Sequence, residues 1–164
     1  MVIKRLTSAD QSKLDHLIQI IEDSLLDADW WLPIQETARV HFFDSSWTIF
    51  YGTFDGEELV GASALFLNQF EFKEAALHIG VPLDGTAEIG RCMVNPKCRG
   101  NNLMLKMNKV LVDVAKENGV KRIVATAHPS NESSCHSLVS LGMRKNGEIT
   151  KYNTFKRNIY LIEL

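Results

Sequence analysis

The sequence of 164 residues is poor in cysteine. It contains only Cys92, Cys98 and Cys135, and no two of them form a C-x-x-C pair. An odd number of cysteines without a repeated short spacing predicts reduced thiols rather than a disulfide framework or a structural zinc site. We therefore expect a protein that holds no metal.

Long apolar runs and an excess of one charge are also missing. No stretch approaches the roughly 18 consecutive apolar residues that a membrane span requires, and the N-terminal residues 1–6 lack the apolar run of a signal peptide. The formal net charge of −2 argues against a general nucleic-acid binder, which is usually strongly basic. We expect a cytoplasmic protein that binds neither membrane nor nucleic acid, with a local basic patch for a small polyanion still possible.

What the sequence does contain is the composition of an ordinary globular domain. Hydrophobic residues make up 45% of the chain and charged residues 23%, both close to the average for proteins with a packed core. There are no repeats, no low-complexity segments and no linkers rich in glycine, serine or proline. The sequence predicts a single domain over residues 1–164.

The pattern of apolar residues predicts a mixed α/β order of elements around one sheet. An Asp55-Gly56 pair between two apolar runs indicates a tight hairpin turn. Strands are expected over 2–6, 47–54, 59–67, 87–94 and 122–127, helices over 10–25, 70–79, 100–118 and 131–142, a short helix within 37–43, and a hairpin or pair of strands over 152–164.

The segment 94–103, between a predicted strand and a predicted helix, has the properties of an anion site. Pro96 ends the strand, and Gly100 allows the backbone to approach a ligand closely. The first turn of a helix offers unpaired N–H groups and the positive end of the helix dipole, and Lys97 and Arg99 add positive charge. Spacing alone leaves a solvated loop before a core helix as an equal alternative.

This segment resembles the acyl-CoA-binding motif of the GNAT N-acetyltransferase superfamily, roughly Gln/Arg-x-x-Gly-x-Gly/Ala. Lys97, Gly100 and Asn102 occupy the three positions, and Asn102 departs from the very small residue that is usual there. A second resemblance lies downstream, where family members carry Asn-x-x-Ala and a helix that ends in Gly-Phe. Here Asn131 and Ser134 begin that helix. Together the two matches extend over residues 86–143.

The resemblance implies a fold, a cofactor and a set of contacts. The expected fold is a mixed, mostly antiparallel sheet with helices on both faces, and the expected acyl donor is acetyl-CoA. Its pantetheine arm would follow the strand before the loop, and its pyrophosphate would lie on the loop and the first helical turn. The implied cofactor contacts are Cys92, Met93, Val94, Lys97, Arg99, Gly100, Asn101, Asn102, Leu103, Asn131 and Ser134.

The resemblance does not identify the general acid or the general base. Leu138 stands where many GNAT enzymes have a tyrosine that acts as the acid. Glu88, on the strand where many members place a base, is one candidate, and an exposed strand carboxylate is an equal alternative. His128, at a strand end, is the other, although a lone histidine is more often structural. Trp30, Trp31 and Phe42 form either a wall of the acceptor pocket or part of the core.

The leading prediction is transfer of an acetyl group from acetyl-CoA to an amine on a small molecule or a peptide. A non-catalytic acyl-CoA-binding sensor is the alternative, because the usual tyrosine is missing. A nucleotide-phosphate binder of another fold is a third possibility that rests on the Gly100 loop alone and lacks a P-loop Gly-Lys-Ser/Thr. A homodimer is possible through the C-terminal strands.

Overall fold

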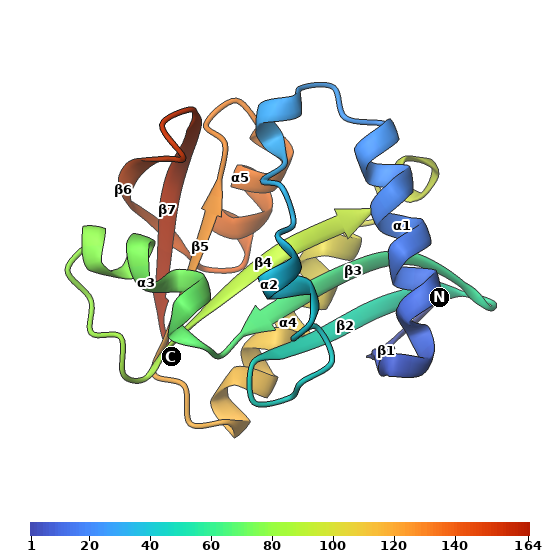
Figure 1. Cartoon of the computed structure of the whole chain (residues 1–164), viewed down its shortest axis with the longest axis horizontal. Coiled ribbons are helices and arrows are strands. Elements are labelled where there is room, and N and C mark those ends of the chain that lie inside the picture. The colour runs from blue at the N-terminus through green and yellow to red at the C-terminus, as the bar shows by residue number, and fades with distance from the viewer.

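A seven-stranded sheet in the order β1-β2-β3-β4-β5-β7-β6 forms the centre of the computed structural model, which describes residues 1–164 (Figure 1). The strands are β1 Val2–Arg5, β2 Thr48–Asp55, β3 Glu58–Phe66, β4 Thr86–Val94, β5 Arg122–Ala127, β6 Arg144–Lys151 and β7 Phe155–Glu163. The helices are α1 Gln11–Asp23, α2 Glu36–Arg39, α3 Gln69–His78, α4 Leu103–Glu117 and α5 Glu132–Ser140, with short 3-10 turns η1 Ser8–Asp10, η2 Ala28–Trp30 and η3 Pro96–Cys98.

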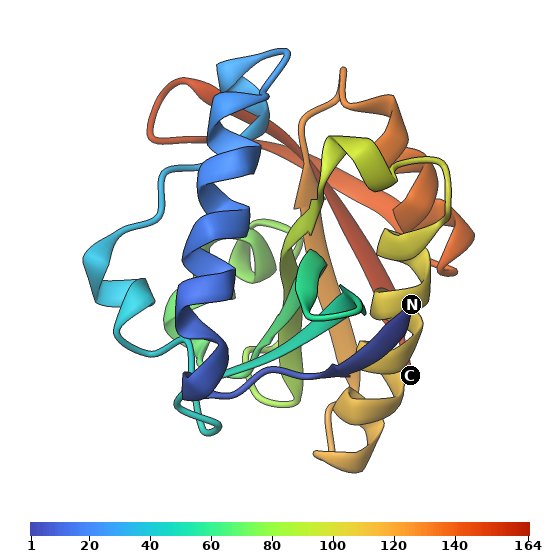
Figure 2. The same ribbon diagram turned by 90° about the vertical axis from the view of Figure 1, so that its right-hand side faces the viewer.

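Helices cover both faces of this sheet. In Figure 2 the sheet separates α1, in blue, from α4 and α5, in gold and orange. The apolar residues Leu14, Leu17 and Ile18 recur at helical spacing along α1 and are buried against one face. Leu111 of α4 and Leu138 of α5 are buried against the other face. The predicted mixed α/β sheet with helices on both faces is confirmed.

The central strands β4 and β5 pair for only a short distance and then separate. They are the only parallel pair, and their register extends over residues 86–88 of β4. Beyond Glu88, β4 continues to Val94 and β5 continues to Ala127 without pairing with each other. A β-bulge at Arg91, which has a φ of 50°, bends β4 away at this point. The sheet is therefore open at its centre.

Most of the predicted elements match the structure to within a few residues, but three predictions need correction. The long helix begins at Leu103 rather than at residue 100, because Gly100 and Asn102 have positive φ values of 85° and 54° that no α-helix contains. The segment 27–44 forms η2 and only one turn of α2, not a helix over 37–43.

The third correction concerns the C-terminal hairpin, which was predicted within 152–164. Its first strand, β6, already begins at Arg144, and residues 152–154 form the turn. The strand has the sequence R-K-N-G-E-I-T-K, with a single apolar residue, because it is the edge strand of the sheet and most of its side chains face solvent. Such a strand lacks the apolar alternation that a sequence-based prediction requires.

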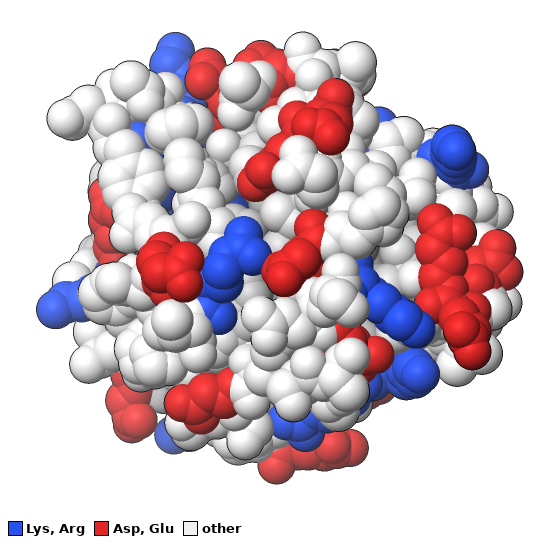
Figure 3. Space-filling view, turned by 45° about the vertical axis from the view of Figure 1, so that its right-hand side comes forward, with Lys and Arg blue, Asp and Glu red and all other residues white.

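The surface carries both charges in a dispersed pattern. Figure 3 shows acidic and basic side chains interspersed on one face, without a large area of a single sign. No helix of the chain combines the length and the apolar character that crossing a bilayer requires.

Candidate active site

A cavity of about 700 Å³ occupies the opening between β4 and β5. Its walls come from β4, the loop before α4, the end of β5, α5, the segment around η2 and the β6–β7 hairpin. Eleven of the thirteen predicted site residues line it: Glu88, Cys92, Met93, Val94, Arg99, Gly100, Asn102, Leu103, His128, Asn131 and Ser134. Lys97 and Asn101 are exposed and lie outside its lining.

The loop before α4 presents an unusual series of free backbone donors. None of the N–H groups from Gly100 to Leu105 donates to a backbone carbonyl within the chain, and no side chain caps the helix at Asn102. The left-handed conformations of Gly100 and Asn102 produce this turn. Asparagine tolerates the left-handed region better than most residues, which explains why it can replace the very small residue of the family motif. The arrangement suits a phosphate-bearing ligand.

A buried polar cluster fixes β4 next to this loop. The Ser63 hydroxyl donates to Asn108 Oδ1 at 2.6 Å and lies 3.0 Å from Cys92 Sγ. Ser63 of β3 and Asn108 of α4 are completely buried. Their contacts with Cys92 join both elements to β4. Burial raises the pKa of the Cys92 thiol, so this residue is a neutral packing group rather than a nucleophile. The cluster holds the unpaired edge of β4 in place against the cavity.

The carboxyl group of Glu88 lies where β4 and β5 separate. Its side chain is buried, and its Oε2 atom has no hydrogen-bond partner. Burial raises the pKa of Glu88 to about 7, with a smaller opposing effect from the charge of Lys151. Gly90 leaves room for the carboxyl group, because a Cβ atom there would lie 3.2 Å from Glu88 Oε1. Glu88 is therefore not the exposed strand carboxylate that was the alternative.

His128 is half-buried at the end of β5 and is held by its neighbour Ser130. The backbone N–H of Ser130 donates to His128 Nδ1 at 3.1 Å, and the Ser130 hydroxyl lies 2.8 Å from the same atom. The Trp30 indole N–H in turn donates to Ser130 Oγ at 2.9 Å. Because Nδ1 accepts a hydrogen bond, the proton of the neutral ring lies on Nε2. In this state His128 can donate a proton at Nε2 but cannot accept one there.

Helix α5 forms the wall that faces the loop before α4. Asn131 caps the helix by accepting a hydrogen bond from the Ser134 backbone N–H at 3.3 Å. Ser134, Ser137 and Leu138 follow at helical spacing on the side that lines the cavity. The Ser137 hydroxyl is buried without a partner, and Leu138 is only 2% exposed. An apolar side chain and two hydroxyl groups therefore line this part of the cavity.

Arg91 is a site residue that the sequence analysis missed. Its guanidinium donates from Nη1 to the Leu32 carbonyl and from Nη2 to the Pro33 carbonyl at 3.2 Å. It also lies 5.1 Å from the centre of the Trp31 ring. No signal in the sequence could have identified Arg91. Its position depends on the β4 bulge, where its φ is positive, and a sequence does not reveal a bulge.

These contacts make the segment around η2 a wall of the cavity. Trp30 and Trp31 line the cavity, as one of the two interpretations predicted, whereas Phe42 is 4% exposed and belongs to the core. At the far end of the segment, Gln35 Nε2 donates to the Tyr152 hydroxyl of the β6–β7 turn at 3.4 Å. The cavity thus has one wall rich in backbone donors and another wall that is aromatic and charged.

The sequence model of the Acetyltransferase (GNAT) family matches residues 15–143, well over half of the chain. The chain belongs to this family. The matched region includes the opening between β4 and β5, the loop before α4 and the wall formed by α5. A search among curated proteins gave no match to the sequence.

Solved structures share the whole fold at low sequence identity. An N-acetyltransferase from Staphylococcus aureus Mu50 superimposes with a TM-score of 0.75 at 16% identity, over 99% of this chain and 97% of that one. A ribosomal-protein-alanine N-acetyltransferase from Brucella melitensis gives 0.75 at 16% identity over 100% of both chains. A Salmonella typhimurium protein solved with its cofactor acetyl-CoA gives 0.73 at 16% identity, over 100% of this chain and 94% of that one.

Proposed function

We propose that this GNAT family member transfers the acetyl group of acetyl-CoA to an amine by direct attack, with Glu88 as the general base. The observation that carries the proposal is the Glu88 carboxyl group, which is buried without a hydrogen-bond partner at the fork of the two central strands. A buried carboxylate with an unsatisfied oxygen is costly, and such groups are concentrated at functional sites.

Glu88 suits the removal of a proton from an ammonium group. A general base is most effective when its pKa lies near the working pH, and burial raises the pKa of Glu88 to about 7. An amine must lose its proton before it can attack, because the protonated form has no lone pair. Glu88 would accept this proton at Oε2, directly or through one water molecule.

The donor side of the site fits acetyl-CoA. The free N–H groups from Gly100 to Leu105 would hold the pyrophosphate, with Arg99 adding charge. The unpaired edge of β4 at Cys92, Met93 and Val94 would pair with the amides of the pantetheine arm, and Asn131 and Ser134 would line its other side. Acetyl-CoA supplies an electrophilic thioester carbonyl, and backbone donors of β4 would polarise it.

The departing thiolate needs no strong acid in this site. A thiol has a much lower pKa than an amine, so the thiolate can leave without taking up a proton at the same moment. The Ser137 hydroxyl, which lacks a partner, can donate a hydrogen bond to it from the wall next to Leu138. His128 Nε2–H is a second possible donor. Positioning of the two reactants would provide much of the acceleration.

The proposal is tested in two steps. Calorimetry should detect binding of CoA, and release of free thiol should then report turnover of acetyl-CoA over a panel of amines. Absence of binding at millimolar CoA contradicts the proposal completely. Binding without acetylation of any amine would instead support the alternative of a non-catalytic acyl-CoA sensor.

A further inference from the structure

Arg157 of β7 is a buried cation with an unused donor. Its side chain lines the cavity although it is only 3% exposed, and its Nη2 atom is buried without a hydrogen-bond partner. Its Nη1 atom donates to the Lys156 carbonyl at 2.7 Å. An arginine keeps its charge in this environment, and a buried charge is stable only when it is paired. Arg157 therefore lacks the anionic partner that its burial demands.

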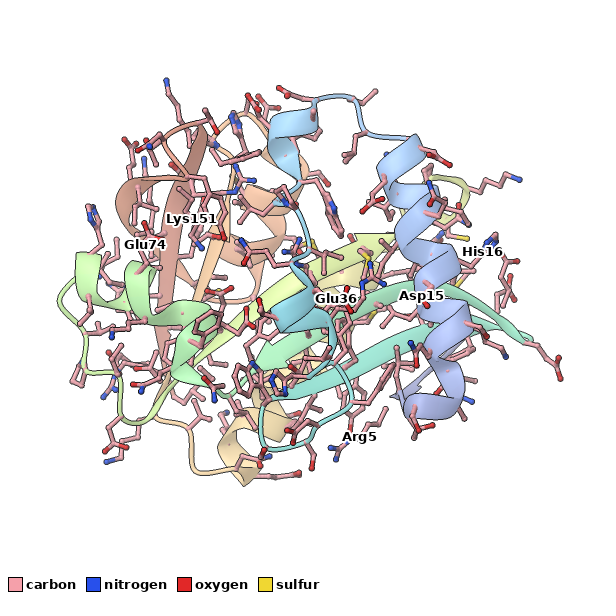
Figure 4. All side chains as sticks on the ribbon, viewed as in Figure 1. Arg5, Asp15, His16, Glu36, Glu74 and Lys151 are labelled. Atoms are coloured by element: carbon pink, nitrogen blue, oxygen red, sulfur yellow. The ribbon has the colours of Figure 1, made fainter.

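Lys151 is a second buried cation on the same hairpin. It ends β6, is 8% exposed and lines the same cavity. Its ammonium group forms neither a salt bridge nor a hydrogen bond within the chain, in contrast to Lys145, which pairs with Glu148 at 2.6 Å on the exposed side of β6. Figure 4 shows Lys151 on the β6–β7 hairpin.

The other charged groups of the cavity do not neutralise this pair. Arg91 adds a third positive charge, and its donors are used by the segment around η2. Glu71 of α3 is held by the Trp47 indole N–H at 3.3 Å. Asp29 is the acidic residue whose charge acts on Arg157, yet the two form no ion pair. No acidic side chain therefore forms a hydrogen bond or an ion pair with Arg157 or Lys151.

We propose that Arg157 and Lys151 bind a carboxylate on the acceptor, so that the substrate of this enzyme is a small amine that carries a carboxylate, such as an amino acid. The inference rests on the proposed acetyl transfer and names its substrate class. The planar guanidinium can hold a carboxylate with two hydrogen bonds, and Lys151 adds a third donor.

The same arrangement orients the substrate and excludes competitors. Lys151 lies near enough to Glu88 for its charge to act on that carboxyl group, so an acceptor whose carboxylate lies on the hairpin presents its amine to Glu88 and Glu71. A diamine without a carboxylate would bring a second positive charge toward Arg157 and Lys151 and would be repelled. Selectivity for carboxylated amines therefore combines attraction with repulsion.

The test compares acceptors that differ only in the carboxylate. Glycine, alanine, glutamate and γ-aminobutyrate are each paired with the carboxamide of the same skeleton, and kcat/KM is measured by thiol release. The acids should exceed their carboxamides by roughly 10- to 100-fold, as expected for a charge-assisted hydrogen bond. Arg157→Met should abolish this preference by raising KM for the acids, with KM for the carboxamides unchanged.

Two further variants separate recognition of the acceptor carboxylate from the general effect of removing a positive charge. Lys151→Met should reduce the same preference to a smaller extent. Arg144→Met removes an exposed arginine from β6 and should leave the preference intact. The melting temperature of Arg157→Met should equal or exceed that of the unmodified chain, because an apolar side chain replaces an unpaired buried charge.

Equal kcat/KM values for acids and carboxamides would overturn the inference while leaving acetyl transfer in place. If no acceptor reacts, calorimetry with the same acids and carboxamides, added to the CoA-loaded protein or to the protein alone, decides the question. Acids that bind to the unmodified chain but not to Arg157→Met support the carboxylate site even when acetyl transfer fails. If no acid binds, the carboxylate site is refuted.

Discussion

The guanidinium of Arg91 lies 5.1 Å from the centre of the Trp31 ring and connects the bulge of β4 to the segment around η2. The side chain of Arg91 therefore joins the strand that would hold the cofactor to the wall that would hold the acceptor. Because the backbone of Arg91 has a positive φ, the direction of this side chain is set by the bulge itself.

Loss of this connection should affect the acceptor more than the cofactor. Arg91→Met keeps an unbranched, flexible side chain but removes the donors to the Leu32 and Pro33 carbonyls, so the wall should become mobile. We expect KM for the acceptor to rise by about tenfold, with the Kd for CoA unchanged in calorimetry. Arg39→Met, which removes a half-buried arginine paired with Asp15, is the control. An equal loss of CoA affinity would contradict this role of Arg91.

The pH dependence of the rate should reveal Glu88. The carboxyl group accepts a proton only when it is ionised, and its pKa is raised to about 7, so kcat/KM should rise with pH up to an inflection near 7. Glu88→Gln should lower kcat/KM by about 10²–10⁴-fold and remove this inflection, leaving only the rise that comes from deprotonation of the amine. A variant that keeps the inflection would exclude Glu88 as the base.

The same carboxyl group should make stability depend on pH. Its pKa is higher in the folded chain than its ordinary value of 4.5, so the folded state binds more protons between these values. The free energy of unfolding should decrease as pH rises from 4.5 to about 7, by up to about 3 kcal/mol from this group. Glu88→Gln should therefore flatten urea-unfolding stabilities across this range. An unchanged slope would mean that the folded chain does not raise the pKa of Glu88.

Gly100 and Gly119 are matched positions for testing whether the loop before α4 binds CoA. Both have positive φ values, 85° and 75°, and a Cβ atom at either position meets nothing within 4 Å. Gly100→Val and Gly119→Val should therefore cost similar stability, at least about 1 kcal/mol. Only Gly100→Val should prevent CoA binding, because its side chain would occupy the space in front of the free N–H groups. Normal CoA binding by Gly100→Val would show that the loop has been assigned wrongly.

His128 should matter less than Glu88. Since Ser130 donates to Nδ1, the neutral ring of His128 has no free acceptor for the proton of the amine. His128→Ala should lower kcat/KM by less than about tenfold, through loss of a donor at Nε2 and a looser contact with Trp30. A loss as large as that of Glu88→Gln, measured with the same acceptor, would assign the role of base to His128 instead.

Local signals in the sequence were sufficient for the fold and for one side of the site. The apolar periodicity of α1 and α4 and the tight turn at Asp55-Gly56 depend on nearby residues, and these elements lie within three residues of their predicted positions. The loop at Gly100 was found for the same reason, since its proline, glycine and basic residues are adjacent in the chain. Local chemistry of this kind can be recognised without knowing what the segment packs against.

Only the tertiary structure determined the acceptor side. Arg91, Lys151 and Arg157 are ordinary basic residues in the sequence, and each becomes significant through burial against segments that are distant in the chain. The raised pKa of Glu88 arises in the same way, because desolvation depends on all the atoms that surround a group. The edge strand β6 was missed because its pairing with β7, rather than its own apolar pattern, makes it a strand. The sequence by itself thus determined the family and the position of the loop at Gly100, whereas burial and long-range pairing decided the charges that an acceptor would meet.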